Sequence, residues 1–338
     1  MGTHNVGRVG ALLETARSDG PIVEILEAAA LEDDELFPTV LPTKRDVGWA
    51  SWVTIQIGCN NSCAFCIVPS VRGEEISRPF GDLVDEVTRL AADGVSEVTL
   101  LGQNVDSYGR DLALRLRRRA RPMFADLLDA VGSVEGIRRV RFVSPHPKDI
   151  DTETLAVMGQ NPAVCEHLHL PLQSGSDDIL AAMHRGYRAE RYLRVVAEAR
   201  ARVPDLALTT DIIIGFPGET EADFSATLEV AATAEYESAF TFIYSPREGT
   251  EAAAMKDKFV PHATSVERMD RLRPIVERSS TRSNQRRVGM IEEVIVEGPS
   301  RRDPSVLTGR TRQNRLVHFS SVSPIRLGSY ATVEITSA

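Results

Sequence analysis

From residue 53 onward, the hydrophobic positions of the chain follow two alternating patterns. Short runs of β-branched and other apolar residues alternate with longer stretches in which apolar positions recur every three to four residues. This alternation is typical of a parallel sheet whose strands are joined by crossover helices. The predicted strands are 53–57, 97–101, 139–143, 167–170, 208–214 and 240–244, and the predicted helices are 82–93, 124–131, 152–158, 189–202 and 221–235.

The C-terminal part of the chain follows a different pattern. Alternating apolar and polar residues at 292–296, 315–319 and 331–335 predict short strands of a small barrel. The predicted fold class is therefore α/β, with a partial barrel of six βα units, fewer than the eight of a complete TIM barrel, followed by a small OB-like all-β barrel. The predicted domain limits are 1–45, 46–282 and 283–338.

Three cysteines, Cys59, Cys63 and Cys66, follow the first predicted strand with the spacing C-x3-C-x2-C. Four-iron clusters are usually held by four thiolates, so three would leave one iron open to another ligand. A structural zinc knuckle without its fourth ligand, or three thiols that bind no metal, are the alternatives. No His or Cys follows at zinc-site spacing, which disfavours the zinc knuckle.

Other strand ends carry polar and glycine-rich segments. Gly102, Gln103 and Asn104 follow the second strand, Gln173 follows the fourth, and Asp211 lies in the fifth. In parallel α/β folds, ligands bind at the carboxyl ends of the strands, so these residues are candidates for one site. Gly-rich and Pro-rich loops are also ordinary turns, and each segment alone is weak evidence.

Composition and charge narrow the classes of function. The formal net charge is −9, yet arginines concentrate in the C-terminal third, which favours a local polyanion-binding surface. A second basic run, 115–121, is either a phosphate contact or an exposed insertion. No apolar run reaches the ~18 residues of a membrane helix. With 4 Cys in 338 residues and no signal peptide, we expect a cytoplasmic protein without disulfides.

The cysteine motif resembles that of the radical S-adenosylmethionine (SAM) superfamily, and further segments resemble the tRNA methylthiotransferases within it. The similar segments are 58–78, 99–108, 144–147, 169–177, 211–220 and 308–319. The resemblance implies a [4Fe-4S] cluster on Cys59, Cys63 and Cys66, whose open iron binds SAM and whose electron cleaves it to a 5′-deoxyadenosyl radical.

The same resemblance implies roles for the other candidates. Phe65, just before the last Cys, would lie against the adenine of SAM, with ordinary core packing as the alternative. Gly102, Gln103 and Asn104 would lie near the methionyl end, and Gln173 and Asp211 near the ribose or the substrate. The C-terminal segment resembles a TRAM domain, which would bind RNA. The alternative is that its basic residues only form a solvated charged face. Its implied tRNA contacts are Arg310, Arg312, Asn314, Arg315 and Phe319.

The implied reaction is methylthiolation at C2 of N6-isopentenyladenosine at tRNA position 37, next to the anticodon. The alternatives are the same reaction on threonylcarbamoyladenosine and a non-catalytic RNA-binding remnant. The tRNA anticodon region and an electron donor such as flavodoxin or ferredoxin are the expected partners, without a membrane, and the chain is expected to be a monomer.

One feature departs from the family. Its members carry three further Cys for a second, auxiliary [4Fe-4S] cluster, and residues 1–50 contain none. Residues 1–45 are therefore interpreted as a remnant of an N-terminal methylthiotransferase domain. Cys165, the remaining thiol, is interpreted as a packing residue.

Overall fold

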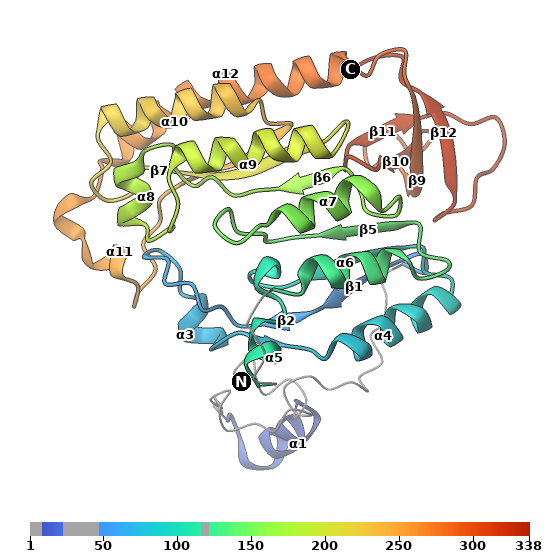
Figure 1. The fold of residues 1–338 in the computed structure, drawn as a ribbon, viewed down its shortest axis with the longest axis horizontal. Helices are drawn as coiled ribbons and strands as arrows, with labels where there is room; N and C mark the ends of the chain where they lie inside the picture. The colour runs from blue at the N-terminus through green and yellow to red at the C-terminus, as the bar shows by residue number, and fades with distance from the viewer. Residues whose placement is uncertain (1–8, 23–46, 116–121) are drawn as a thin grey trace.

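The computed structural model describes residues 9–22, 47–115 and 122–338. Two three-stranded parallel sheets form its centre, in the orders β1-β4-β5 and β6-β7-β8. An isolated parallel bridge between Val140 and Val164 joins them into one open, curved wall, with helices outside it (Figure 1). The strands are β1 (Ala50–Thr54), β4 (Glu97–Leu101), β5 (Arg139–Phe142), β6 (His167–His169), β7 (Ala207–Ile214) and β8 (Ser238–Ile243).

The crossover helices are those that the apolar periodicity predicts. They are α4 (Phe80–Ala92), α6 (Phe124–Gly132), α7 (Thr152–Gln160), α9 (Ala189–Arg202) and α10 (Glu221–Ala234). Thr220 and Asp223 cap α10 reciprocally, because each side chain bonds the other residue's backbone N–H. Asp151 caps α7 by accepting a hydrogen bond from the Thr154 N–H at 2.8 Å.

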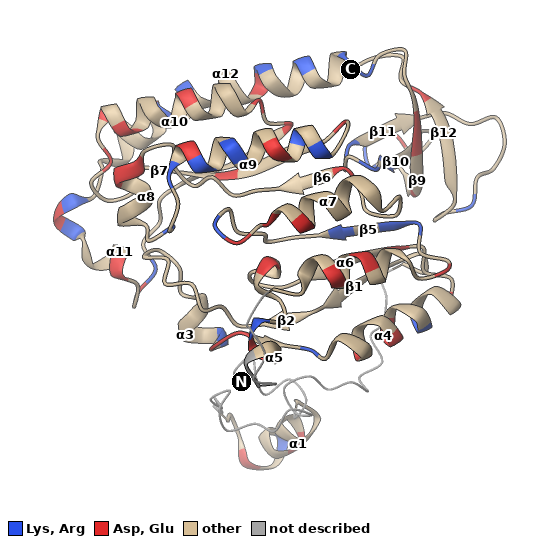
Figure 2. Cartoon of the chain, in the orientation of Figure 1, with Lys and Arg blue, Asp and Glu red and all other residues tan. Residues whose placement is uncertain are grey.

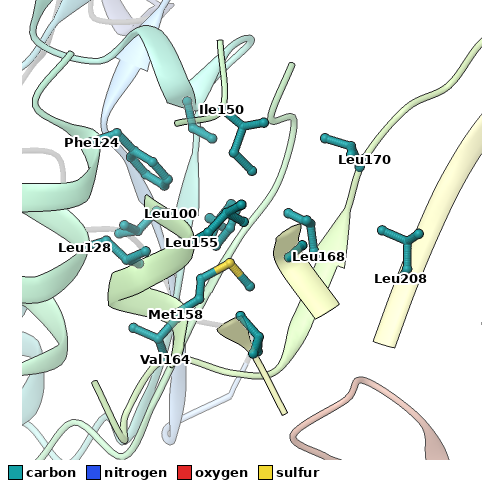
Figure 3. Packing of buried hydrophobic residues seen from close by; sticks show 14 of the residues in the cluster. Leu100, Phe124, Leu128, Ile150, Leu155, Met158, Val164, Leu168, Leu170 and Leu208 are labelled. Carbon is teal, nitrogen blue, oxygen red and sulfur yellow. The ribbon is translucent and has the colours of Figure 1, made fainter. Parts of the chain in front are cut away.

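The core fills the space between the wall and these helices. Leu100, Leu168 and Leu208 from three strands are almost completely buried, and Phe124 and Leu128 of α6 lie among the same group of side chains (Figure 3). Burying a side chain of this size contributes about 1.5–3 kcal/mol to folding, so this core fixes the positions of the strand ends.

The first predicted strand is divided in the structure. β1 ends at Thr54, and the next short strand, β2 (Gln56–Ile57), leaves the wall to pair antiparallel with β3 (Ile76–Ser77). The cysteine loop and the short helix α3 (Val68–Arg72) lie between β2 and β3, whereas α5 (Arg110–Arg115) follows β4. Of the basic run 115–121, Arg115 ends α5, and the other residues lie outside the described residues.

Three further helices were not predicted. α8 (Asp177–Ala182) and α11 (Glu251–Ala254) are short, and α12 (His262–Gln285) is long but rich in arginine and interrupted by Pro274. α12 packs on β8 and α10. It is anchored by an ion pair between the buried side chains of Arg268 and Glu219, with 2.7 Å between Nη1 and Oε2.

The C-terminal segment forms a four-stranded antiparallel sheet in the order β11-β10-β9-β12. Its strands are β9 (Ile291–Pro299), β10 (Leu307–Thr311), β11 (Leu316–Phe319) and β12 (Tyr330–Glu334). β10 was not predicted, because its polar sequence has no apolar alternation. Gly309 allows the pairing, since a Cβ there would lie 2.6 Å from Cγ2 of Val294.

Of the predicted N-terminal segment 1–45, the structure describes only the surroundings of α1 (Val9–Asp19), a helix with no buried residue. The rest of that prediction lies outside the described residues, and the three domain limits stay predictions. In the parts of the chain that the structure describes, no helix has the length and apolar character to cross a membrane.

Candidate functional site

The cysteine loop begins with a turn that requires glycine. Gly58 has a φ of 76°, and a Cβ at this position would lie 1.9 Å from the backbone oxygen of Glu74. The next residue, Cys59, donates its N–H to the Gly73 oxygen at 3.1 Å. The start of the loop is thus tied to the segment between α3 and β3, which fixes the position of the first thiol.

Two other segments hold the rest of the loop. The Ala64 N–H donates to the Met183 oxygen at 3.1 Å, and the Ala64 oxygen accepts from the Ala252 N–H at 2.8 Å. Nδ1 of His184 lies 3.0 Å from the Ser62 oxygen. A small apolar cluster beneath the loop includes Ala64, Met183 and Ala252, and Phe65 packs half-buried against it. The loop is therefore positioned from both sides.

The three loop thiols are free and half-buried. The pKa of Cys59 is raised to about 11, mainly by burial and to a smaller extent by Glu75 and the nearby thiols of Cys63 and Cys66. Burial also raises the pKa of Cys66. The three thiols therefore lie close enough to affect one another's pKa.

Among the described residues, no group of three or more His, Cys, Asp or Glu side chains is gathered tightly enough to hold a single metal ion. A cubane makes no such demand, because each thiolate binds a different iron. Three thiols on one anchored loop are a donor set that fits a [4Fe-4S] cluster.

The segment after β4 places buried polar atoms at the same edge of the wall. Nδ2 of Asn104 donates to Oδ2 of Asp149 at 2.9 Å, whereas the side-chain oxygens of Gln103 and Asn104 are buried with no partner in the described structure. Gly102 packs on Gln56, and a Cβ on Gly102 would lie 2.9 Å from the Gln56 Cγ. Space for Gln56 is thus a sufficient reason for this glycine.

The structure brings Gln173 and Asp211 together. The Gln173 N–H donates to the Asp211 oxygen at 2.8 Å, and Oδ2 of Asp211 lies 3.3 Å from Nε2 of His169. Gln173 has a φ of 66°, an uncommon conformation for a residue with a side chain, and its Oε1 is a further buried acceptor without a described partner. Unpaired buried acceptors are costly, so these oxygens fit a ligand that carries amino and hydroxyl donors, as SAM does.

Two residues that the sequence analysis did not select lie close by. Asp106 is completely buried, its Oδ2 accepts from the His146 N–H at 2.8 Å, and its Oδ1 has no described partner. Burial raises the pKa of Asp106 well above its usual value and lowers that of His146 to about 2. The His146 ring is therefore neutral at pH 7. Both residues lie in segments that resemble the tRNA methylthiotransferases, 99–108 and 144–147, and this resemblance could have identified them as candidates.

A cavity of about 900 Å³ runs along the inner side of β6, β7 and β8 toward the C-terminal sheet. His169, Thr209 and Asp211 supply polar lining, and Phe240 and Phe242 supply apolar lining. Asp211 is the predicted site residue common to this cavity and the strand-end cluster. The described lining does not include the three loop cysteines, so the cavity and the cysteine loop are distinct parts of the structure.

The predicted RNA contacts lie mainly where the C-terminal sheet meets the wall. Arg312 forms a two-bond ion pair with Glu166, at 2.7 and 2.8 Å, and Arg315 pairs with Glu237 at 2.6 Å. Arg310 pairs with Glu297 within the sheet at 2.5 Å. Their guanidinium groups are thus already partnered.

The other two predicted contacts differ from each other. Asn314 is exposed at the turn between β10 and β11, whereas Phe319 is half-buried over Gly309. Cys165 is 2% exposed beside β5, in agreement with its interpretation as a packing residue.

Comparisons with known proteins agree with this geometry. The family model described as the radical SAM superfamily matches residues 53–231, and the TRAM domain model matches 285–338. The chain is 49% identical over 346 residues to the tRNA-2-methylthio-N(6)-dimethylallyladenosine synthase of Mycobacteroides abscessus, covering 100% of this chain and 67% of that protein. It is 49% identical over 345 residues to the enzyme of the same name from Salinispora arenicola, covering 100% of this chain and 66% of that protein.

A solved structure of the radical SAM methyltransferase TsrM from Kitasatospora setae, with cobalamin and a [4Fe-4S] cluster, is also similar. Its TM-score is 0.48 at 17% identity, over 60% of this chain and 38% of that one. The chain spans about two thirds of the length of the curated relatives it matches. By its motifs, both family models and these relatives, the chain belongs to the radical SAM tRNA methylthiotransferases.

Proposed function

We propose that this chain binds a [4Fe-4S] cluster through Cys59, Cys63 and Cys66, cleaves SAM reductively, and acts on C2 of N6-isopentenyladenosine in tRNA. The isopentenyl group is the dimethylallyl group in the relatives' name. The observation that carries the proposal is the anchored three-cysteine loop, at a strand-end edge with unpartnered buried acceptors. We place the catalytic domain at 46–282 and the RNA-binding domain at 283–338.

The cluster, when bound, supplies the electron that cleaves SAM. The chain's own residues position the cofactor. Oε1 of Gln103, Oδ1 of Asn104 and Oε1 of Gln173 would accept hydrogen bonds from the amino group and ribose hydroxyls. Phe65, held against the small apolar cluster, would lie beside the adenine. Each of the three hydrogen bonds would give a buried oxygen the partner that it lacks in the described structure.

The cavity beside Asp211 suits the substrate. Enzymes that act on a base first remove it from its stack, and a pocket of about 300–1,000 Å³ is usual for a molecule of this size. His169, Thr209 and Asp211 offer hydrogen bonds to an adenine edge. Phe240 and Phe242 offer an apolar surface to the isopentenyl group. A threonylcarbamoyl group carries a carboxylate, and the two arginines that line the cavity, Arg287 and Arg315, are already paired with Glu292 and Glu237, so the isopentenyl substrate is favoured.

Transfer RNA would approach the C-terminal sheet. Asn314 is exposed and could contact it, although its Oδ1 accepts a hydrogen bond from Arg310 at 3.2 Å. Arg310, Arg312 and Arg315 would have to exchange their carboxylate partners for phosphate. The electron would come from a low-potential donor such as flavodoxin or ferredoxin, with the chain acting as a monomer.

The test is to incubate the anaerobically reconstituted 338-residue chain with reductant, SAM and isopentenylated tRNA. We expect 5′-deoxyadenosine, formed faster with isopentenylated than with unmodified tRNA. Because Cys165 is the only Cys beyond the loop, we expect no methylthio product from this polypeptide alone. Mass spectrometry of the digested tRNA measures that product. Absence of 5′-deoxyadenosine from a cluster-loaded chain would support the RNA-binding remnant instead.

A further inference from the structure

Arg185 lies directly behind the cysteine loop, on the segment that follows α8. Its side chain belongs to a residue only 5% exposed, and its Nη1 is 3.4 Å from Sγ of Cys63. Nε donates to the Tyr187 hydroxyl at 3.3 Å, and Nη2 lies 3.5 Å from the Pro171 oxygen. The guanidinium also stands 5.5 Å from the centre of the Tyr187 ring. Its orientation is thus fixed from several sides.

The described residues give this buried guanidinium no carboxylate partner within ion-pair distance. Its described neighbours are neutral, since burial raises the pKa of Tyr187 and lowers that of His146. An isolated buried charge is very unfavourable, whereas a paired one is tolerated. Among the described side chains, the group nearest to Nη1 that can carry the missing negative charge is the thiolate of Cys63, together with the cluster that it would bind.

We propose that Arg185 is a positioning residue for the cluster, whose fixed positive charge favours the reduced state. The inference rests on the proposed function, because it takes Cys63 as a cluster ligand. Reduction adds one electron and one negative charge to the cluster, and the electron comes from the external low-potential donor. Arg185 keeps its proton throughout. A nearby cation stabilises the reduced state more than the oxidised state, because the reduced state carries the greater negative charge.

The experiment compares Arg185→Gln, which removes the charge, with Arg185→Lys, which retains it. Arg194→Gln is the matched control, since Arg194 is exposed on α9 and pairs with Glu190. Each full-length protein is reconstituted anaerobically, checked for folding by circular dichroism, and assayed for iron and sulfide. The cluster is then titrated with dithionite and followed by electron paramagnetic resonance, with and without SAM.

With cluster loaded, we expect Arg185→Gln to lower the ratio of reduced to oxidised cluster at fixed potential by tenfold or more. For a one-electron couple, tenfold is about 59 mV. Arg185→Lys should stay within about threefold of the parent, and Arg194→Gln should match it. A loaded Arg185→Gln cluster with an unchanged potential overturns the inference. An effect on SAM affinity alone also overturns it, because Arg185 would then act on SAM.

If Arg185→Gln does not fold or does not bind a cluster, the Arg185→Lys protein provides the test. A tenfold lower ratio of reduced to oxidised cluster in that variant, which retains the charge, contradicts the inference. Failure of the parent chain to bind any cluster would instead refute the proposed function, so the two failures can be told apart.

Discussion

Arg139 offers the sharpest test of how the C-terminal sheet is fixed to the wall. The residue lies in β5 and is completely buried, and Figure 2 shows basic residues along this strand. Its guanidinium donates to the backbone oxygens of Arg310 and Glu293, at 2.7 and 2.9 Å, and to Oε1 of Glu293 at 3.2 Å. Replacing it with alanine leaves the two carbonyl oxygens and Oε1 of Glu293 without their donor, whereas Oε2 of Glu293 keeps its bond with Arg138.

The expected cost follows from these contacts. Leaving a buried carbonyl oxygen without its donor costs about 1–3 kcal/mol, and two such oxygens lose their donor in Arg139→Ala. The neighbouring Arg138 is the control, because its exposed ion pair with Glu293 contributes about 0–1 kcal/mol. Its stacking on Tyr330 adds about 0.5–1 kcal/mol. Arg138→Ala should therefore cost less than about 2 kcal/mol.

Urea unfolding followed by tryptophan fluorescence measures both variants. Trp49 is a suitable probe because its side chain lies against Gly328 of the C-terminal domain. We expect Arg139→Ala to lower the free energy of unfolding by at least twice as much as Arg138→Ala. If the C-terminal domain unfolds in a separate transition at lower urea concentration, the same comparison applies to that transition. Equal effects of the two substitutions would refute the view that Arg139 fixes this interface.

Three other predictions concern the cluster loop and the buried ion pair. Alanine at Cys59, Cys63 or Cys66 should abolish the binding of about four irons per chain, measured by iron analysis, and alanine at Cys165 should not. Since the pKa of Cys59 is raised to about 11, its thiol is protonated near neutral pH. Iron binding must release that proton, so reconstitution followed by absorbance should be faster at about pH 8.5 than at about pH 7. A rate independent of pH would contradict the proposed ligand. Glu219→Gln should lower the free energy of unfolding, measured with urea, by about 3–5 kcal/mol, because it leaves the buried Arg268 with the exposed Glu221, 3.5 Å away, as its remaining described ion-pair partner.

The pattern of apolar residues predicted the wall well because its strands and helices bury continuous apolar faces. β4 and α9 have the predicted limits, since each coincides with one unbroken pattern. Elements stabilised by polar contacts were missed. α12 buries Arg268 against Glu219, and β10 pairs through Gly309, and neither pattern is visible in a hydrophobic profile.

In the candidate site, the cysteine loop could be predicted from the sequence, whereas contacts between residues far apart in the chain could not. The cysteine spacing is local in the sequence, so the loop could be recognised without a structure. The contacts of Arg139 with Arg310 span 171 residues, and no local pattern predicts them. For the same reason, Arg312 and Arg315 were interpreted only as RNA contacts, although the structure shows each paired with a carboxylate of the catalytic domain.

Formation of 5′-deoxyadenosine shows whether the cysteine loop holds a cluster that cleaves SAM. The parent chain and Cys63→Ala, both folded by circular dichroism, are treated with iron, sulfide, dithionite and SAM, and the products are measured by mass spectrometry. We predict 5′-deoxyadenosine from the parent chain and none above background from Cys63→Ala. Equal amounts from the two proteins, or none from a parent chain carrying about four irons, would contradict the assignment of this loop as the SAM-cleaving centre.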